Sequence, residues 1–281
     1  MLKALPPYES IFHPSDFTDA SHIAFCHALK LALASQANLT LQHVTSDHHE
    51  HWHDFSGIRE TLERWKLLPK GSDRHAVMKL GIGVEKVMSH GTNPVGSVLH
   101  YLNHHPADLI VLATHTHEGR MKWLHHSQAE PIARGAHTPT LFIPDNVVGL
   151  INYEDGSVNL QNVLIPVSAE PNPMSAVDAA VQLARVLELK RVQFHLLHVG
   201  DEKTMPALDL PRQEGWTWNR LIRPGAVNET IHEAASALNA DLIVMSTAGH
   251  HGFLDALRGS TTERVLHESE CPLLAVPPWR Y

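Results

Sequence analysis

Short apolar runs alternate with stretches of helical periodicity along the whole chain. The run Leu109–Ala113 is short and continuously apolar, which is typical of a parallel strand buried on both faces. The stretch Ala20–Ala34 places apolar side chains three and four positions apart, which predicts an amphipathic helix with Asp19 as its N-cap. Alternating strands and helices of this kind predict an α/β fold built around a parallel sheet.

The same patterns give the expected elements of each half of the chain. In the first half we expect strands at Ile11–Pro14, Leu39–Val44, Val84–Ser89, Leu109–Ala113 and Thr140–Ile143, and helices at Ala20–Ala34, Ile58–Trp65, Pro94–Asn103 and Pro131–Gly135. In the second half we expect strands near Val163–Val167, Val192–Val199, Trp216–Ile222, Leu242–Ser246 and Leu273–Val276, and helices near Met174–Leu189, Val227–Leu238 and Ser260–Glu268. The segment Asp201–Gly215 holds two prolines and is expected to be irregular.

An internal repeat divides the chain into two copies. Asp108–Thr114 returns as Asp241–Thr247, and Gln42-His43-Val44 returns as Leu197-His198-Val199. We therefore predict two tandem domains, 1–146 and 158–281, each a doubly wound five-stranded parallel sheet with strand order 3-2-1-4-5. The domains are expected to pair as an intramolecular pseudo-dimer through their last strands, and a homodimer of the whole chain is left open.

The ligand position in such a sheet lies at the carboxyl ends of the strands, where the winding direction reverses. In the second copy this position holds Ser246-Thr247-Ala248-Gly249 and, after nine intervening residues, Gly259-Ser260-Thr261 at a predicted helix start. Glycines and small hydroxyl residues let backbone N–H groups approach an anion, and a helix N-terminus adds partial positive charge. The pattern predicts a phosphate-binding loop; in the alternative interpretation Gly249 is only a turn residue and Ser260 only an N-cap.

At this point the sequence resembles the universal stress protein family, whose fold is Rossmann-like (adenine nucleotide alpha hydrolase-like). The resemblance covers both copies and nearly the whole chain. The residues that carry it are Phe12–Thr18, Ala28–Ala32, Asp241–Gly249, Leu257–Leu266 and Cys271–Val276.

The resemblance implies that ATP or another adenine nucleotide binds to the second domain as a regulatory ligand in a stress response. ATP-binding members carry Gly-x2-Gly-x9-Gly followed by Ser or Thr, an aspartate after the first strand and a valine ending the second. The second copy departs from this pattern where Ser246 replaces the first glycine and Ser168 the aspartate. The residues expected to contact the nucleotide are Val167, Ser168, Val199, Ser246, Thr247, Gly249, Gly259, Ser260 and Thr261.

The first copy keeps the aspartate and the valine of this pattern as Asp16 and Val44 but has lost its glycines. Ala113, Thr116 and His126 stand in their places, and a side chain is costly wherever φ must be positive. We therefore do not expect the first copy to bind ATP in the usual way.

Histidine is unusually frequent, with 24 residues, of which 18 precede residue 151. Imidazole and carboxylate groups bind divalent metal ions. Asp16, His115 and His117 are therefore a candidate site for a divalent ion such as Zn²⁺, or for an anion, in the first domain; Mg²⁺ is a second candidate ion for the protein. The alternative is that these histidines are partly exposed and bind nothing.

Composition narrows the functional classes. A formal charge of −8 argues against general nucleic-acid binding, and the chain has neither an apolar run of 18 residues nor an apolar segment near residue 1 typical of a secretory signal. Two cysteines fit a reducing compartment, so we expect a cytoplasmic protein. We find none of the usual catalytic motifs and expect at most slow ATP hydrolysis. The alternative function is a stress protein without nucleotide, acting through metal in the His-rich first domain or through a protein partner.

Overall fold

The protein is described here from a computed structural model, which places residues 5–45, 52–114, 128–145, 147, 149–247 and 261–278. The chain forms two compact units. Tyr8–Asp145 and Ile151–Val158 make up the first domain, and the rest of the chain makes up the second. Among the placed residues, no helix is long and apolar enough to cross a membrane.

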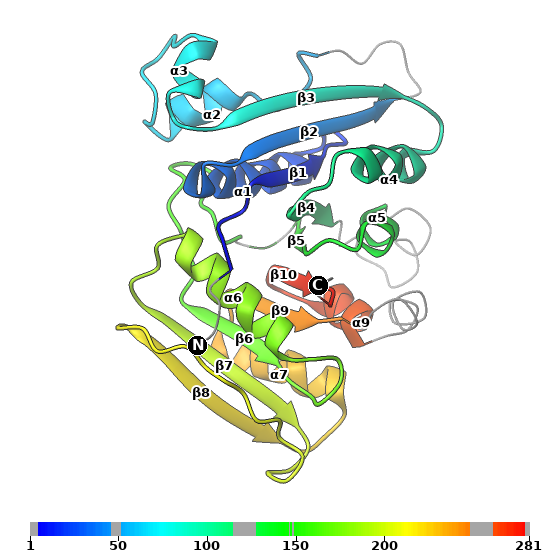
Figure 1. Cartoon of the computed structure of the whole chain (residues 1–281), viewed down its shortest axis with the longest axis vertical. Helices are drawn as coiled ribbons and strands as arrows, with labels where there is room; N and C mark the ends of the chain where they lie inside the picture. Colours follow the sequence, from blue (N-terminus) through cyan, green and yellow to red (C-terminus); the bar gives the residue numbers. More distant parts are fainter. Residues whose placement is uncertain are drawn as a thin grey trace. The chain divides into compact units, whose positions relative to one another are not determined.

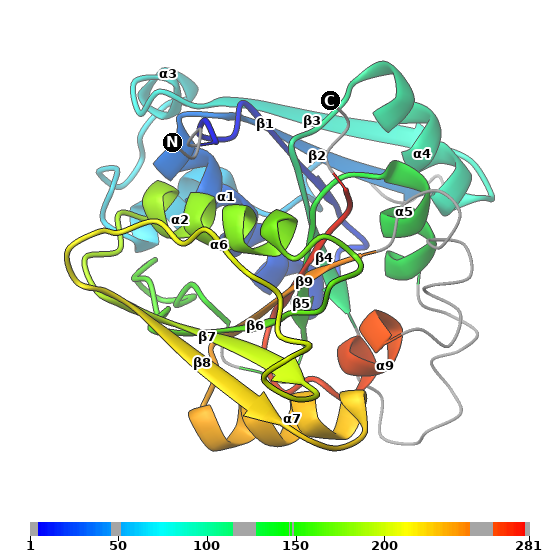
Figure 2. The same cartoon turned by 60° about the horizontal axis from the view of Figure 1, so that its bottom comes forward.

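The first domain is a five-stranded sheet with every pairing parallel and with strand order β3-β2-β1-β4-β5 (Figure 1). Helix α1 lies on one face of this sheet, and α4 and α5 pack together on the other (Figure 2). Its elements are β1 (Ser10–Pro14), α1 (Asp19–Ser35), β2 (Asn38–Thr45), α2 (Ile58–Arg64), α3 (Arg74–Met78), β3 (Gly83–His90), α4 (Pro94–His104), β4 (Leu109–Thr114), α5 (Ala129–Ala136) and β5 (Thr140–Pro144).

The second domain repeats this arrangement, with strand order β8-β7-β6-β9-β10 and every pairing parallel. Helix α6 covers one face of the sheet, and α7 packs with α9 on the other (Figure 2). Its elements are β6 (Asn162–Pro166), α6 (Met174–Val186), β7 (Val192–Val199), β8 (Trp216–Arg223), α7 (Val227–Leu238), β9 (Leu242–Ser246), α9 (Thr261–Glu268) and β10 (Leu273–Val276). Both sheets therefore confirm the predicted fold class and the order 3-2-1-4-5.

Two local features differ from the sequence-based expectation. The N-cap of α1 is Thr18, whose hydroxyl accepts a hydrogen bond from the Ser21 N–H, so Asp19 is the first helical residue rather than the cap. Helix α3 was not expected, because its five residues are too few to show a helical period; it begins where the Asp73 carboxylate accepts a hydrogen bond from the Ala76 N–H.

One aspartate in each copy ties strand four to the start of strand one. Asp108 Oδ2 accepts hydrogen bonds from the backbone N–H groups of Glu9 and Ser10, at 2.8 and 2.9 Å. In the second domain, Asp241 Oδ2 accepts hydrogen bonds from the backbone N–H groups of Gln161 and Asn162, the residue before β6 and the first residue of β6, both at 2.8 Å. A carboxylate that accepts two backbone hydrogen bonds is a strong tie, which explains why this aspartate opens the repeated sequence.

A segment beyond β5, Ile151–Val158, packs on α1 and α2 of the first domain, and we call it the clasp. The backbone carbonyl of Tyr153 accepts a hydrogen bond from Trp65 Nε1 at 2.9 Å, and the Arg64 guanidinium lies 3.8 Å from the centre of the Tyr153 ring. The Ile151 N–H donates to Nε2 of the buried His27 at 3.2 Å. These contacts make the clasp part of the first domain, although it follows the last strand of that domain's sheet in the chain.

Candidate functional site

The second domain has a pocket of about 290 Å³ at the carboxyl ends of β6, β7 and β9. This is the position at which the winding of the sheet reverses, where ligands of doubly wound folds bind. The proline-containing loop from Ser168 to Pro173, which includes a cis peptide bond between Glu170 and Pro171, forms one side of the pocket, and the first residues of α9 form part of the lining.

Six of the residues predicted from the sequence line this single pocket. They come from the ends of three strands and from the beginning of a helix: Val167, Ser168, Val199, Ser246, Thr247 and Thr261. The other three predicted residues, Gly249, Gly259 and Ser260, lie outside the described residues. The structure therefore brings together the described part of the predicted site.

Val167 lines the pocket, and two hydrogen bonds hold its backbone in place. Its backbone N–H donates to the carbonyl of Leu197 at 2.8 Å, which extends the pairing of β6 and β7 by one residue. Its carbonyl lies 3.0 Å from Nδ1 of His198, and Nε2 of the same imidazole lies 2.8 Å from the Thr204 hydroxyl. His198 is a positioning residue that connects Val167 to the loop after β7.

The repeat contains a signal for His198 that the sequence analysis did not use. His43 occupies the same place in the first copy, and its Nδ1 lies 2.6 Å from the carbonyl of Ser15, the residue that corresponds to Val167. A histidine repeated at the end of the second strand, one position before the predicted valine, could have been recognised as part of the site.

Ser246 uses its hydroxyl to connect β9 with the beginning of α6. The hydroxyl donates to the carbonyl of Asn172 at 2.8 Å and accepts from the Ala176 N–H at 3.1 Å. A glycine could not make these bonds. The replacement of the expected glycine by serine therefore has a structural reason in this chain.

The hydroxyls of Ser168 and Thr247 are also bonded to backbone carbonyls. Ser168 is exposed, and its hydroxyl donates to the Glu170 carbonyl at 2.6 Å, which fixes the turn after β6. Thr247 is buried, and its backbone N–H donates to the Val276 carbonyl at 2.8 Å, while its hydroxyl lies 3.4 Å from the same oxygen. Both residues contact the pocket while their side chains stabilise its walls.

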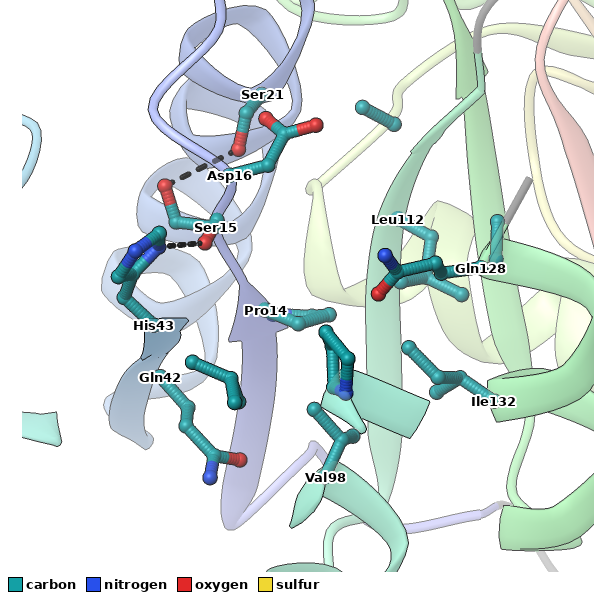
Figure 3. Close-up of a pocket in the computed structure, with 14 residues that line it drawn as sticks. Pro14, Ser15, Asp16, Ser21, Gln42, His43, Val98, Leu112, Gln128 and Ile132 are labelled. Atoms are coloured by element: carbon teal, nitrogen blue, oxygen red, sulfur yellow. Dashed lines mark hydrogen bonds between the residues drawn. The ribbon is translucent and has the colours of Figure 1, made fainter. Parts of the chain in front are cut away.

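The first domain has a smaller pocket of about 160 Å³ at the corresponding position, also at the carboxyl ends of its strands (Figure 3). Asp16 lies at its mouth, and its Oδ1 accepts hydrogen bonds from the backbone N–H and the hydroxyl of Thr18, at 3.1 and 2.6 Å. His115 and His117, the proposed metal partners of Asp16, lie outside the described residues. In the part of the chain that the structure describes, no group of three or more His, Cys, Asp or Glu side chains could hold a metal ion.

A buried histidine, His13, contacts Ser21 of the pocket lining. His13 Nδ1 lies 2.8 Å from the Val111 carbonyl, and the Ser21 hydroxyl lies 3.3 Å from its Nε2 and 3.2 Å from Ser15 Oγ. Burial lowers the pKa of His13 to about 4, because the charged imidazolium would lose its hydration. At neutral pH this imidazole is therefore uncharged and acts as a hydrogen-bonding core residue.

Comparison with known proteins identifies the family. The model of the universal stress protein family matches residues 7–144 and 212–277. A curated universal stress protein of Synechocystis is 27% identical over 154 residues, which are 48% of this chain and 95% of that protein.

The fold is also found in a solved structure that aligns with nearly the whole chain. The crystal structure of a universal stress protein from Archaeoglobus fulgidus aligns with a TM-score of 0.64 at 17% identity, over 98% of this chain and 97% of that chain. A crystal structure of a universal stress protein in complex with cAMP aligns with 50% of this chain and 99% of its own, at 18% identity and a TM-score of 0.39. From the match to the family model over both copies, we conclude that the chain belongs to the universal stress protein family as a tandem, two-domain member.

Proposed function

We propose that the second domain binds an adenine nucleotide such as ATP, as a regulatory ligand in a cytoplasmic stress response. One observation carries the proposal: six residues predicted from the sequence, from four separate segments of the chain, line one pocket at the winding reversal of the second sheet.

The lining suits a molecule with an apolar end and an anionic end. Val167, Val199 and Met245 offer apolar surface for a nucleobase. Thr261 and Thr262 lie in the first turn of α9, where unpaired backbone N–H groups and the helix dipole attract phosphate oxygens. The volume of about 290 Å³ is close to the lower bound of small-molecule pockets, roughly 300 Å³, which fits a nucleoside whose phosphates extend towards α9.

The chemistry of the lining favours binding over hydrolysis. Among the described residues of the pocket there is no lysine or arginine to neutralise a transferring phosphoryl group, and Glu170 is the one carboxylate. We therefore propose a signalling ligand with at most slow turnover.

The first test is direct. The purified full chain is denatured, the released small molecules are examined for adenine absorbance, and the refolded or ligand-free chain is titrated with ATP, with ADP and with cAMP by calorimetry. Val199→Phe should lower the affinity at least about tenfold, because the larger ring occupies the pocket. Gln193→Phe, at an exposed position of the same strand, is the control. A chain that binds none of the three nucleotides at millimolar concentration, or a Val199→Phe variant that binds as well as the parent, would overturn the proposal.

A second test restores the carboxylate that ATP-binding relatives of this type are expected to carry. Ser168→Asp should tighten binding by about tenfold, because a carboxylate accepts charge-assisted hydrogen bonds from the N–H or O–H groups of a nucleoside. Ser168→Asn has nearly the same size without the charge and should not tighten it. Equal affinities of the two variants would place the nucleoside away from residue 168 and contradict the proposed orientation.

A further inference from the structure

The pocket of the first domain contains a buried amide that the fold leaves partly unsatisfied. Gln42 is 1% exposed, and its Nε2 donates to Ser89 Oγ at 2.9 Å. Its Oε1 is buried and has no hydrogen-bond partner among the described residues. An unpaired buried acceptor is costly, so its presence in a pocket lining points to a donor that the pocket receives from outside.

The second domain shows that the fold itself does not require this amide. Leu197 occupies the corresponding position of β7 and lines the corresponding pocket. The backbones of the two residues make equivalent hydrogen bonds. The carbonyl of Gln42 accepts a hydrogen bond from the Ser15 N–H, and the carbonyl of Leu197 accepts one from the Val167 N–H, both at 2.8 Å. The glutamine side chain is therefore an addition to the first pocket and not a part of the common framework.

The rest of the lining indicates which molecule would bring the donor. Figure 3 shows Asp16 at one end of the pocket and Gln42 at the other, with Pro14 between them and with Val98, Leu112 and Ile132 along the remaining walls. The pocket thus has a carboxylate at its exposed end, walls that combine apolar side chains with the neutral polar groups of Ser15, Ser21 and Gln128, and the buried Gln42 amide at its other end. Among its described lining residues there is no lysine or arginine, which disfavours a phosphate.

The volume of the pocket and the charges of its lining restrict the class of ligand further. A volume of about 160 Å³ is well below the roughly 300–1,000 Å³ of pockets for drug-sized ligands, which favours a small molecule. An ammonium group fits beside the carboxylate of Asp16, which is exposed. At the buried end a second charge would be expensive to desolvate, whereas a neutral hydroxyl can donate to Gln42 Oε1. We propose that the first domain binds a short aliphatic amino alcohol, with its ammonium group at Asp16 and its hydroxyl at Gln42.

The proposal is tested on the full chain with 4-amino-1-butanol as the probe and 1-butylamine as the analogue that lacks the hydroxyl, by calorimetry or ligand-observed NMR. The parent chain should prefer the amino alcohol several-fold, by up to about tenfold for one buried hydrogen bond. In Gln42→Leu this preference should disappear, because the hydroxyl has lost its acceptor while the apolar walls remain. The four affinities form a thermodynamic cycle that isolates the contact between the hydroxyl and the amide.

Two further measurements complete the test. Asp16→Asn should weaken the binding of both amines and leave that of 1-butanol unchanged. Gln42→Leu should fold, since the second domain carries leucine at this position, and its circular dichroism spectrum checks this. Equal affinity of the parent for the amino alcohol and 1-butylamine, or a preference that survives in Gln42→Leu, would overturn the proposal. Tighter binding of 1,4-diaminobutane than of the amino alcohol would overturn the choice of a neutral buried end. These outcomes do not depend on nucleotide binding by the second domain.

Discussion

The two domains share a framework of hydrogen bonds and differ in what they place around their pockets. In both, an aspartate ties strand four to the start of strand one, and a histidine at the end of strand two bonds to the carbonyl of the first residue after strand one. These contacts use backbone groups of the partner, so they survive when neighbouring side chains change. The framework of this fold is therefore kept in both domains while the side chains around the two pockets differ.

The two domains differ in the groups that surround the shared histidine. In the second domain, His198 Nε2 lies 2.8 Å from the Thr204 hydroxyl. In the first domain, the ring of Phe17 stacks on His43, with ring centres 3.8 Å apart and planes inclined by 16°. Phe17 has a φ of 63°, a left-handed conformation that phenylalanine seldom adopts. The first domain thus places aromatic surface beside its pocket where the second places a polar loop.

The largest expected difference between the domains is their response to acid. Burial lowers the pKa of both His13 and His27, in the first domain, to about 4. The unfolded chain takes up these protons near pH 6.5, so between pH 6.5 and 4 the unfolded state holds more protons and the free energy of unfolding falls as the pH falls. At about 1.4 kcal/mol per pKa unit, each histidine contributes roughly 3 kcal/mol that is present above pH 6.5 and lost by pH 4.

Amide hydrogen exchange measured by mass spectrometry between pH 7 and 4 checks this prediction for each domain separately. The first domain should lose protection at higher pH than the second, where the pKa of the half-buried His267 is also lowered to about 4 and burial lowers the pKa of His195. Replacing His27 by glutamine should reduce the pH dependence of the first domain by about half, whereas His75→Gln, at an exposed position, serves as the control. Equal loss of protection in both domains would contradict it.

The next largest effect is expected from exchanging the buried residues of the two pockets. Leu197→Gln should lower the free energy of unfolding of the second domain by about 2–4 kcal/mol, because it buries an amide without partners in place of an apolar side chain. The reverse change, Gln42→Leu, should be neutral or stabilise the first domain by up to about 1 kcal/mol, because it removes an unpaired acceptor at the cost of one bond to Ser89. Urea unfolding followed by hydrogen exchange in each domain measures both, and a large loss in Gln42→Leu would show that the amide is part of the framework.

The smallest difference is expected at the repeated aspartates. Asp108→Ala and Asp241→Ala each remove two hydrogen bonds between a carboxylate and backbone N–H groups. Each variant should lower the free energy of unfolding of its own domain by about 2 kcal/mol, a value that already allows for the weakening of these bonds by solvent at partly exposed carboxylates. The two losses should agree within about 0.5 kcal/mol and should be additive in the double variant. Thermal unfolding of the three variants measures these losses. Clearly unequal losses in the two single variants would show that the two aspartates contribute differently to stability in spite of their similar hydrogen bonds.

Much of the fold could be predicted from the sequence because buried parallel strands leave a strong signal. A continuous apolar run as short as Leu109–Ala113 is typical of a buried strand, and the internal repeat showed the same run a second time at Leu242–Ser246. The N-cap of α1 was misplaced by one residue because Thr18 and Asp19 are both good caps, and only the geometry of the Ser21 N–H decides between them.

The candidate site was predictable where residues follow strands directly and less so where side chains bond to distant backbone. Val167, Val199 and Thr247 follow or end strands, so the topology alone places them at the pocket. The bond between Ser246 and Asn172 joins positions 74 residues apart, and no pattern in the sequence indicates it. The unpaired oxygen of Gln42 is likewise a property of its surroundings and became visible only with the pocket.

The clasp determines where the first domain can be cut. A fragment that ended after β5 would contain every strand of the first sheet. It would, however, remove Gly156 and Tyr153 of the clasp, which contact the Trp65 ring at the end of α2, and would expose that ring to solvent. The same cut would leave the imidazole of His27 facing solvent in place of the Ile151 N–H. A minimal fragment for crystallisation or NMR should therefore extend through Val158, well beyond the last strand.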